Sequence, residues 1–179
     1  MSASKPSSAP AAPIFAAYGI KVGDDAVQNP LKLTALDVED LAVISACLQD
    51  AISRVADTAY EPKRRRFAIL FNRFRWENEA SPSLGGWLGP RTPERVRCAV
   101  HFDGVTAVRH RNINQANPEQ LLDLLAIQTQ EQRDGGVRIQ LMFAGGPEML
   151  LEAECVDCYL EDLSQPWAAA GRPEHSTEE

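Results

Sequence analysis

A cationic segment offers the clearest binding chemistry in the chain. Residues 63–76 read KRRRFAILFNRFRW, so four consecutive cations precede an apolar stretch that ends in alternating arginines and aromatic residues. Arginine binds phosphate and carboxylate groups, and aromatic rings stack on nucleic-acid bases. Arg73 and Arg75 share one face of the expected strand, so we expect them to project together. The predicted binding residues are Arg64, Arg65, Arg66, Arg73, Arg75, Trp76, Arg109 and Arg111.

The partner of this arginine-rich face stays open at this point. Phe74 and Trp76 beside the arginines would suit RNA or single-stranded DNA. An anionic lipid headgroup or an acidic protein surface, including the acidic C-terminal segment of another copy, would suit the arginines equally. The same charges could simply solvate a hairpin tip and keep an edge strand from aggregating. A structural or protein-interaction role is the leading interpretation.

His101 and Asp103 form the best candidate pair for acid–base catalysis. Two residues apart on an expected strand, they share a face and could act as a histidine–carboxylate pair. No serine or cysteine stands in a recognised nucleophile motif, and Gly145-Gly146-Pro147 lies between two expected strands, as a hairpin turn would. We therefore predict no catalytic residue and keep a small-ligand or enzyme site near His101 and Asp103 as an alternative.

The cysteines give little support to redox or metal chemistry. Cys155 and Cys158 form a C-x-x-C motif, but the surrounding carboxylates oppose the thiolate that redox chemistry needs. Cys98 and His101 could complete a zinc site only if a bulge brought them together, because their odd spacing places them on opposite strand faces. We predict no metal and no cofactor.

Composition describes an acidic globular chain of 179 residues with a net charge of −7. Residues 54–111 hold 12 basic and 6 acidic residues, a balance of +6, whereas the remainder holds 6 and 19, a balance of −13. Overall acidity argues against wholesale coating of nucleic acid but allows a local basic patch. Without an apolar run long enough to span a bilayer, without a secretory signal and with only four cysteines, a cytoplasmic location is the expectation.

The pattern along the chain predicts one globular domain between two arms. Residues 1–30 are rich in Ala, Ser and Pro and predict a disordered arm, although Ile14, Phe15, Tyr18, Ile20 and Val22 could dock as a short segment. Residues 31–167 form the expected domain, and residues 168–179 a flexible tail. Asp37 is the expected cap of an amphipathic helix that extends to Val55.

Mostly two-residue periodicity follows that helix. We expect strands at 58–60, 67–76, 96–102, 105–109, 124–129, 137–143 and 149–153, a loop at 80–93, and one helical turn before residue 124. Apolar residues on both faces of 67–76 predict a strand that is covered on both sides. Asp103-Gly104 predicts a two-residue hairpin, and residues 156–163 predict a short C-terminal helix because Val156, Tyr159, Leu160 and Leu163 share a helical face.

The resulting fold prediction is α+β. It has a strongly curved antiparallel sheet or partly closed barrel of six to seven strands, one N-terminal amphipathic helix and a short C-terminal helix.

Several segments also resemble a known family. The stretches LKLTALDVEDLAVISACLQDA, FAILFNRFRWE, RVRCAVHFDGVTAVRHRNI, LLAIQ and LEAECVDCYLEDL resemble a mainly alphaproteobacterial family of unknown function, number 2948 in the domain-of-unknown-function series. The resemblance spans residues 31–167 and implies a single cytoplasmic domain. It brings no activity, substrate or catalytic residue, and Cys155 fits its pattern better than Cys158.

The predicted function is a cytoplasmic, non-catalytic protein-interaction module that uses the arginine-rich face. Its partner is an unknown protein or another copy of the chain. The alternatives are RNA or single-stranded nucleic-acid binding by the same face, and the small-ligand site near His101 and Asp103.

Overall fold

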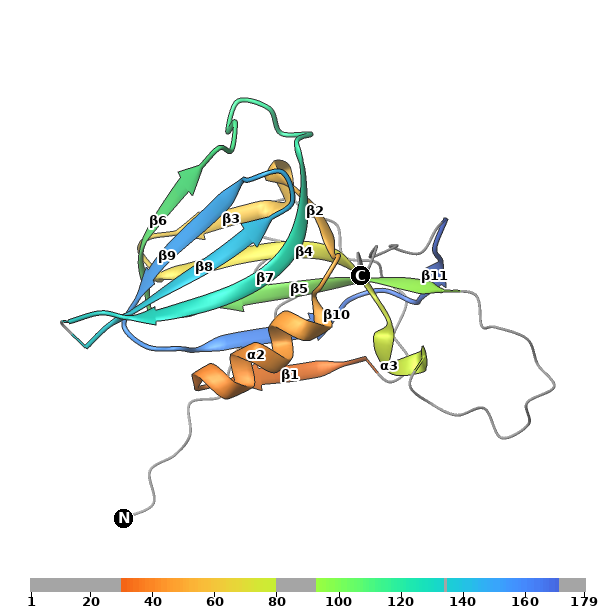
Figure 1. Ribbon diagram of the computed structural model, residues 1–179, viewed down its shortest axis with the longest axis horizontal. Helices are drawn as coiled ribbons and strands as arrows, with labels where there is room; N and C mark the ends of the chain where they lie inside the picture. The colour runs from red at the N-terminus through yellow and green to blue at the C-terminus, as the bar shows by residue number, and fades with distance from the viewer. Residues whose placement is uncertain (1–29, 80–92, 134, 171–179) are drawn as a thin grey trace, which may run out of the picture.

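A computed structural model describes residues 30–79, 93–133 and 135–170, and these form a single eleven-stranded sheet (Figure 1). Every strand pair in it is antiparallel. The strands are β1 (Lys32–Ala35), β2 (Ile52–Arg54), β3 (Thr58–Glu61), β4 (Arg66–Phe74), β5 (Glu94–Phe102), β6 (Val105–Arg111), β7 (Leu121–Glu131), β8 (Val137–Phe143), β9 (Glu148–Ala153), β10 (Cys158–Asp162) and β11 (Trp167–Ala168). The helical segments are α2 (Val38–Cys47), the 3-10 turn η1 (Val55–Asp57) and the single turn α3 (Trp76–Glu79).

The sheet folds into two halves that face one another. The first half runs β1-β10-β5-β4, with β3 beside β4 and β11 beside β5; the second half runs β7-β8-β9-β6. Strand β2 joins them, because it pairs with β4 through Ile52 and Asn72 and with β7 along its whole length. In Figure 1 the second half lies in front of the first. The path from β1 to β6 does not close.

The core lies between the two halves and follows from strand alternation. Side chains at every second position of each strand point to one face, and here the inward positions are apolar. Burial of each large apolar side chain contributes about 1.5–3 kcal/mol. The central inward residues are Phe67, Ile69 and Phe71 on β4, Val100 and Phe102 on β5, Ile139, Leu141 and Phe143 on β8, and Met149 and Leu151 on β9.

Helix α2 packs against β1 and β7 at one side of this core. It begins as predicted, because the Asp37 side chain accepts a hydrogen bond of 2.8 Å from the backbone N–H of Asp40. Leu41 and Ile44 are its buried residues. The helix ends at Cys47 rather than at Val55. Asp50 then adopts a left-handed φ of 58°, which turns the chain into β2.

The α+β prediction is wrong. The described residues contain eleven strands rather than six or seven, one helix longer than a single turn, and no C-terminal helix. Residues 158–162 form strand β10, in which Cys158, Leu160 and Asp162 are the buried positions. Because the inward-facing Asp162 is charged, the two-residue apolar alternation is broken there, and the sequence mimics a helical face.

Three local predictions have different outcomes. The Asp103-Gly104 hairpin is wrong, because β5 pairs with β4, β10 and β11 while β6 pairs with β9. Gly104, with a φ of 71°, instead turns the chain from the first half into the second. The hairpin of β8 and β9 around Gly145-Gly146-Pro147 is confirmed. Residues 121–131 are strand throughout, so the expected helical turn before residue 124 is wrong.

The expected arm, loop and tail remain largely untested. Residues 1–29, 80–92 and 171–179 lie outside the described residues, so the domain limits stay predictions. Strand β11 does show that the ladder of the first half includes Ala168. Among the described residues, no helix is both long and apolar enough to cross a membrane.

Candidate functional site

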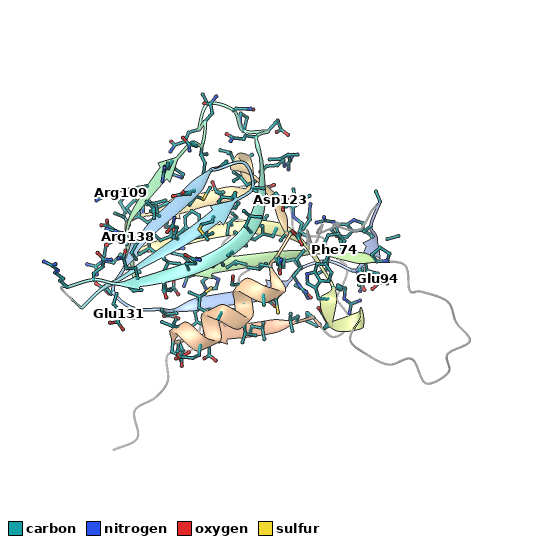
Figure 2. The ribbon with its side chains drawn as sticks, in the orientation of Figure 1. Phe74, Glu94, Arg109, Asp123, Glu131 and Arg138 are labelled. Carbon is teal, nitrogen blue, oxygen red and sulfur yellow. The ribbon has the colours of Figure 1, made fainter. Side chains whose placement is uncertain are left out.

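The structure divides the eight predicted binding residues between distant places. Strand β4 has nine residues, and at 3.3 Å per residue its two ends are about 26 Å apart. Three of the candidate arginines lie at its start, whereas Arg73, Arg75 and Trp76 lie at its end. Arg109 and Arg111 belong to β6 in the second half. Figure 2 shows this separation, with Arg109 far from Phe74 at the end of β4. The eight residues therefore do not form one continuous surface.

Arg73 is inside the protein, so the expectation that it projects to solvent with Arg75 is wrong. Its side chain is 0% exposed. Nε and Nη2 donate to the two carboxylate oxygens of Asp162, at 2.9 and 2.8 Å. Nη2 and Nη1 also donate to Glu77, at 2.8 and 3.1 Å, and Nη1 donates to the carbonyl of Phe74 at 3.0 Å. These bonds use all five N–H donors of the guanidinium.

Arg73 therefore has a structural role. Burial alone would lower the pKa of Arg73, but its hydrogen bonds to Glu77 and Asp162 raise it overall, so the side chain stays charged. With Asp162 and Glu77, it ties the end of β4 to β10 and to α3.

The aromatic residues beside Arg73 are also engaged within the chain. The rings of Phe74 and Trp76 are 5.2 Å apart, and the guanidinium carbon of Arg95 lies 3.8 Å from the centre of the Phe74 ring. Arg75 pairs with Glu94, with 3.0 Å between Nη1 and Oε2. Phe74 is buried. Among the described residues, this region therefore offers no second free ring next to Trp76 on which a base could stack.

The arginines at the start of β4 contact carboxylates as well. Arg64 lies 3.3 Å from Glu61, and Arg65 pairs with Glu154. Arg66 grips Asp103 with two hydrogen bonds, one of them from Nη2 to Oδ2 at 2.7 Å. Arg66 thus connects the start of β4 to the corner where the chain passes from β5 to β6, and Arg65 connects the turn before β4 to the residues that follow β9.

Arg109 and Arg111 lie on the outer face of the second half. We call this surface the polar face; its residues are Ala107, Arg109 and Arg111 on β6, Glu148, Leu150 and Glu152 on β9, Arg138, Gln140 and Met142 on β8, and Ala126, Gln128 and Gln130 on β7. The strand register places them in rows across the four strands, and the opposite face of the same strands forms the core. Arg109 and Arg111 are 66% and 67% exposed.

Ion pairs run across the polar face without covering its arginines. Arg109 lies 3.2 Å from Glu152, and Arg138 approaches the same carboxylate at 3.9 Å. Arg111 lies 3.3 Å from Glu148, which also accepts a hydrogen bond of 3.0 Å from the amide of Gln140. Glu152 thus lies between an arginine of β6 and an arginine of β8. Each of these contacts uses only part of a guanidinium's donor capacity.

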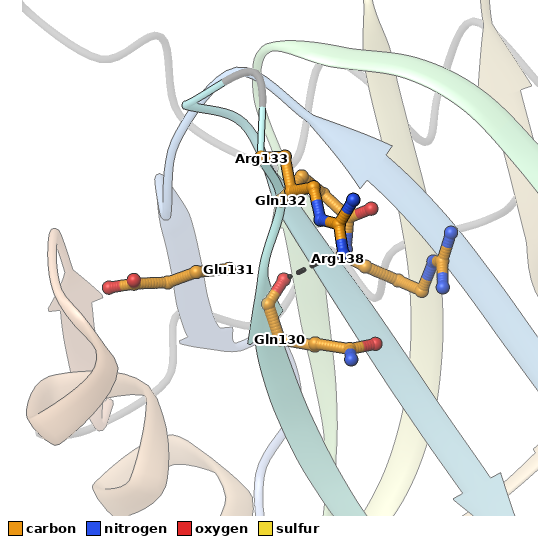
Figure 3. A pocket seen from close by; sticks show the side chains of 5 residues that line it. All are labelled: Gln130, Glu131, Gln132, Arg133 and Arg138. Atoms are coloured by element: carbon orange, nitrogen blue, oxygen red, sulfur yellow. Dashed lines mark hydrogen bonds between the residues drawn. The ribbon is translucent and has the colours of Figure 1, made fainter.

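Two shallow pockets adjoin Arg138. One, of about 270 Å³, is lined by Gln128, Thr129, Gln130, Arg138 and Gln140. The other, of about 420 Å³, lies toward the end of β7 and is lined by Gln130, Glu131, Gln132, Arg133 and Arg138. Figure 3 shows the second pocket, where Gln130 and Arg138 extend to the same side of β7 while Glu131 points away. Their linings are mainly amide and guanidinium groups.

His101 and Asp103 do lie near each other, but the arrangement does not suit catalysis. His101 Nε2 is 3.9 Å from Asp103 Oδ2, a carboxylate that Arg66 already holds. The imidazole is buried and stacked on Tyr159, with ring centres 4.7 Å apart. Burial, assisted by the charge of Arg66, lowers the pKa of His101 to about 4. It is therefore neutral and a weak base at neutral pH.

The four cysteines are free thiols, and two of them, Cys98 and Cys158, are buried. Cys158 is fully buried, and burial raises the pKa of its thiol well above the usual value. Cys155, which precedes β10 in the chain, is exposed. Burial likewise raises the pKa of Cys98. Within residues 30–79, 93–133 and 135–170, no group of three or more His, Cys, Asp and Glu residues is placed to hold a metal ion.

Sequence reasoning missed Arg138 and the glutamines of the polar face. They are spread over residues 128–140, and a four-strand row becomes visible only when β7, β8, β9 and β6 are placed side by side. Alternation offered one usable signal, because Arg138 and Gln140 alternate with Val137, Ile139 and Leu141 and so had to share the outer face of one strand.

Comparison with known proteins identifies a family but no characterised relative. A family model described as a protein of unknown function (DUF2948) matches residues 31–175. Searches of curated proteins and of solved structures found no match to the chain.

Proposed function

The chain belongs to the DUF2948 family of proteins of unknown function, and we propose that it is a non-catalytic domain that binds a protein partner through the polar face. This proposal keeps Arg109 and Arg111 from the predicted arginine-rich face and adds Arg138. It leaves out Arg73, which is buried.

One observation carries the proposal: the exposed arginines of β6 and the half-buried Arg138 of β8 lie on the same sheet face as the glutamine-lined pocket. Arg109 and Arg111 retain exposed guanidinium groups although each contacts a glutamate. Arg138 borders both pockets and contacts Glu152 only at 3.9 Å. A partner carboxylate can therefore approach without first displacing a buried ion pair.

The chemistry of the face indicates an extended, acidic polypeptide segment as its ligand. Arginine binds carboxylates through two parallel hydrogen bonds, and a glutamine amide offers both a donor and an acceptor, as a peptide group does. Gln128, Gln130 and Gln140 line the pocket beside Arg138. Another copy of this chain is one possible source of such a segment, since its net charge is −7.

The two alternatives have less support. Nucleic-acid binding would use Phe74 and Trp76 for stacking, but Phe74 is buried and its ring contacts both Arg95 and Trp76. A catalytic role for His101 is disfavoured by its pKa of about 4 and by the contact of Asp103 with Arg66.

Charge reversal on the polar face tests the proposal. We expect Arg109→Glu combined with Arg138→Glu to abolish recovery of proteins that wild-type protein recovers from native lysate, measured by quantitative mass spectrometry. Lys32→Glu on β1 is the control, because it reverses an exposed charge at the opposite end of the strand path. Circular dichroism must show that all three proteins are folded. A second readout is the mass in solution by light scattering, which reports self-association.

Two results would contradict the proposal. One is recovery of the same proteins by all three samples, together with unchanged mass in solution. The other is retention of single-stranded RNA in a gel shift that weakens steeply as salt rises, which would instead favour the nucleic-acid alternative.

A further inference from the structure

Strand β6 is an edge of the sheet. Within residues 30–79, 93–133 and 135–170 it is the last strand of the path, with β9 as its neighbour. In Figure 1 it is the outermost strand of the second half. Arg109, His110 and Arg111 are all exposed, although the side chains of successive residues point to opposite faces of a strand. The last part of β6 is therefore accessible from both faces of the sheet.

The strand register shows which backbone groups of β6 point to this edge. In an antiparallel ladder, successive residues direct their N–H and C=O groups alternately to one side of the strand and to the other. The backbone N–H of Glu154 donates to the carbonyl of Gly104 at 3.1 Å. In steps of two from Glu154, the residues that bond to β6 are Glu152, Leu150 and Glu148, and their register partners are Ala107, Arg109 and Arg111. The backbone groups of Val108 and His110 therefore point away from β9, toward the edge.

The start of β6 confirms this direction. Val105 is paired with Ala153, so its backbone groups also point to the edge. There its N–H donates to the carbonyl of Arg65 at 2.8 Å, and its carbonyl accepts a hydrogen bond of 3.3 Å from the Tyr60 hydroxyl. Beyond Arg111 the strand ends, and the next residue has a left-handed φ of 55°. The edge that a further strand could use lies between these limits.

The charges of β6 decide which kind of strand this edge can accept. Its sequence, VTAVRHR, contains two arginines and no acidic residue. If β6 of a second copy were added antiparallel with His110 at the centre, Arg109 would lie opposite Arg111, and like charges directly opposite one another are destabilising. A segment with carboxylates at these positions would instead pair with both guanidinium groups, which are 66% and 67% exposed.

We propose that an acidic segment of a partner protein binds as an added antiparallel strand along the edge of β6. This inference rests on the proposed function, because it specifies how the acidic segment is held beside the polar face. Segment residues opposite Val108 and His110 exchange backbone hydrogen bonds with them, whereas residues opposite Arg109 and Arg111 carry the carboxylates. Addition of a strand to a sheet edge is a common mode of peptide recognition, in which backbone bonds provide affinity and alternate side chains provide specificity.

The two faces of β6 predict the sequence pattern of the segment. The arginines lie on the polar face, so the acidic side chains must be two positions apart. Between them, a residue opposite Val108 faces the core side, where Val108 itself is half-buried against the core. The segment therefore alternates acidic with apolar residues.

A set of fluorescein-labelled peptides tests the backbone bonds separately from the charges. The parent peptide is Thr-Glu-Val-Glu-Val-Glu-Thr, and its binding to the full-length protein is measured by fluorescence anisotropy. Methylation of both valine nitrogens removes the N–H groups that face β6, and we expect it to weaken binding at least about tenfold. Methylation of the first two glutamate nitrogens removes N–H groups that face away, and we expect a change of less than about twofold. Replacement of the three glutamates by glutamine should also weaken binding at least about tenfold.

The outcomes distinguish this inference from the proposed function. Equal binding of the parent and both methylated peptides, with weak binding of the glutamine peptide, would overturn strand addition and leave acidic-segment binding at the polar face intact. Equal binding of the parent and glutamine peptides would overturn the need for carboxylates. If the parent peptide does not bind, strand addition is wrong, and the lysate experiment still decides whether the polar face binds a partner.

Amide hydrogen exchange measured by NMR locates the added strand on the protein. In the free protein, we expect the amides of Val108 and His110 to exchange faster than those of Arg109 and Arg111, which bond to β9. Saturation with the parent peptide should slow exchange at Val108 and His110 at least about tenfold and leave Arg109 and Arg111 nearly unchanged. Unchanged exchange at Val108 and His110 in the complex would overturn the inference.

Discussion

The buried ion cluster of Arg73, Asp162 and Glu77 makes the strongest stability prediction. Asp162→Ala would remove two hydrogen bonds from a guanidinium that is 0% exposed, and would also remove the acceptor of the Leu31 backbone N–H. Loss of one partner from a buried ion pair costs about 3–5 kcal/mol. Because Glu77 would still neutralise Arg73, we expect the lower end, about 3 kcal/mol. For a chain of this size, that corresponds to a fall in Tm of about 6–12 °C.

Two companion variants separate burial from charge. Glu77 contacts the same guanidinium but is 40% exposed, so water can replace it and Glu77→Gln should cost less than about 1 kcal/mol. Arg73→Met combined with Asp162→Leu replaces the buried pair with apolar side chains of similar size, a change that is often close to neutral. We therefore expect the double variant to be more stable than Asp162→Ala alone.

Urea unfolding followed by circular dichroism measures all of these free energies. The slope of the transition must stay the same among the variants, so that the midpoints report stability. If Asp162→Ala costs no more than Glu77→Gln, the view that Arg73 depends on Asp162 for its burial is wrong. If the double variant is much less stable than Asp162→Ala, packing rather than charge dominates at this position.

Two further predictions concern His101 and the start of α2. The folded pKa of His101 is about 4, below its usual 6.5, because of burial and the nearby Arg66, so the unfolded chain binds more protons between these values. His101 therefore does not lower the free energy of unfolding above about pH 6.5, but lowers it by about 2 kcal/mol at pH 5. We expect His101→Gln to reduce the loss of this free energy between pH 7.5 and pH 5, measured by urea unfolding. An unchanged loss would contradict the low pKa of His101. Asp37→Ala removes the helix cap and should cost about 1 kcal/mol, with Asp37→Asn, which retains a capping oxygen, as the nearly neutral control in the same assay.

Local features of the fold were predictable where a single short segment determines them. The start of α2 follows from Asp37 and its acidic first turn, and the hairpin of β8 and β9 follows from glycines at a tight turn. Strand pairing is not local. Asp103-Gly104 is a correct turn signal, yet nothing in those two residues states that β5 pairs with β10, about 60 residues later, rather than with β6.

Strand β10 shows how a buried charged residue makes a strand hard to recognise in the sequence. Its inward positions are Cys158, Leu160 and Asp162, so the alternation holds in space but not in hydrophobicity. Asp162 can face inward only because Arg73 of β4 meets it there. In the same way, the burial of Arg73 depends on Asp162. Each residue alone looks like a surface residue, and only the pair explains both positions.

The uneven charge along the chain has the same explanation. Residues 54–111 carry a basic excess and the rest of the chain an acidic excess, and the fold brings arginines of the first next to carboxylates of the second. Arg65 meets Glu154, Arg73 meets Asp162, and the two arginines of β6 meet their carboxylates on β9. These pairs join residues 37–89 positions apart in sequence. Four arginines of the basic segment therefore pair with carboxylates of the later segment, and two of these, Arg109 and Arg111, keep exposed guanidinium groups on the polar face.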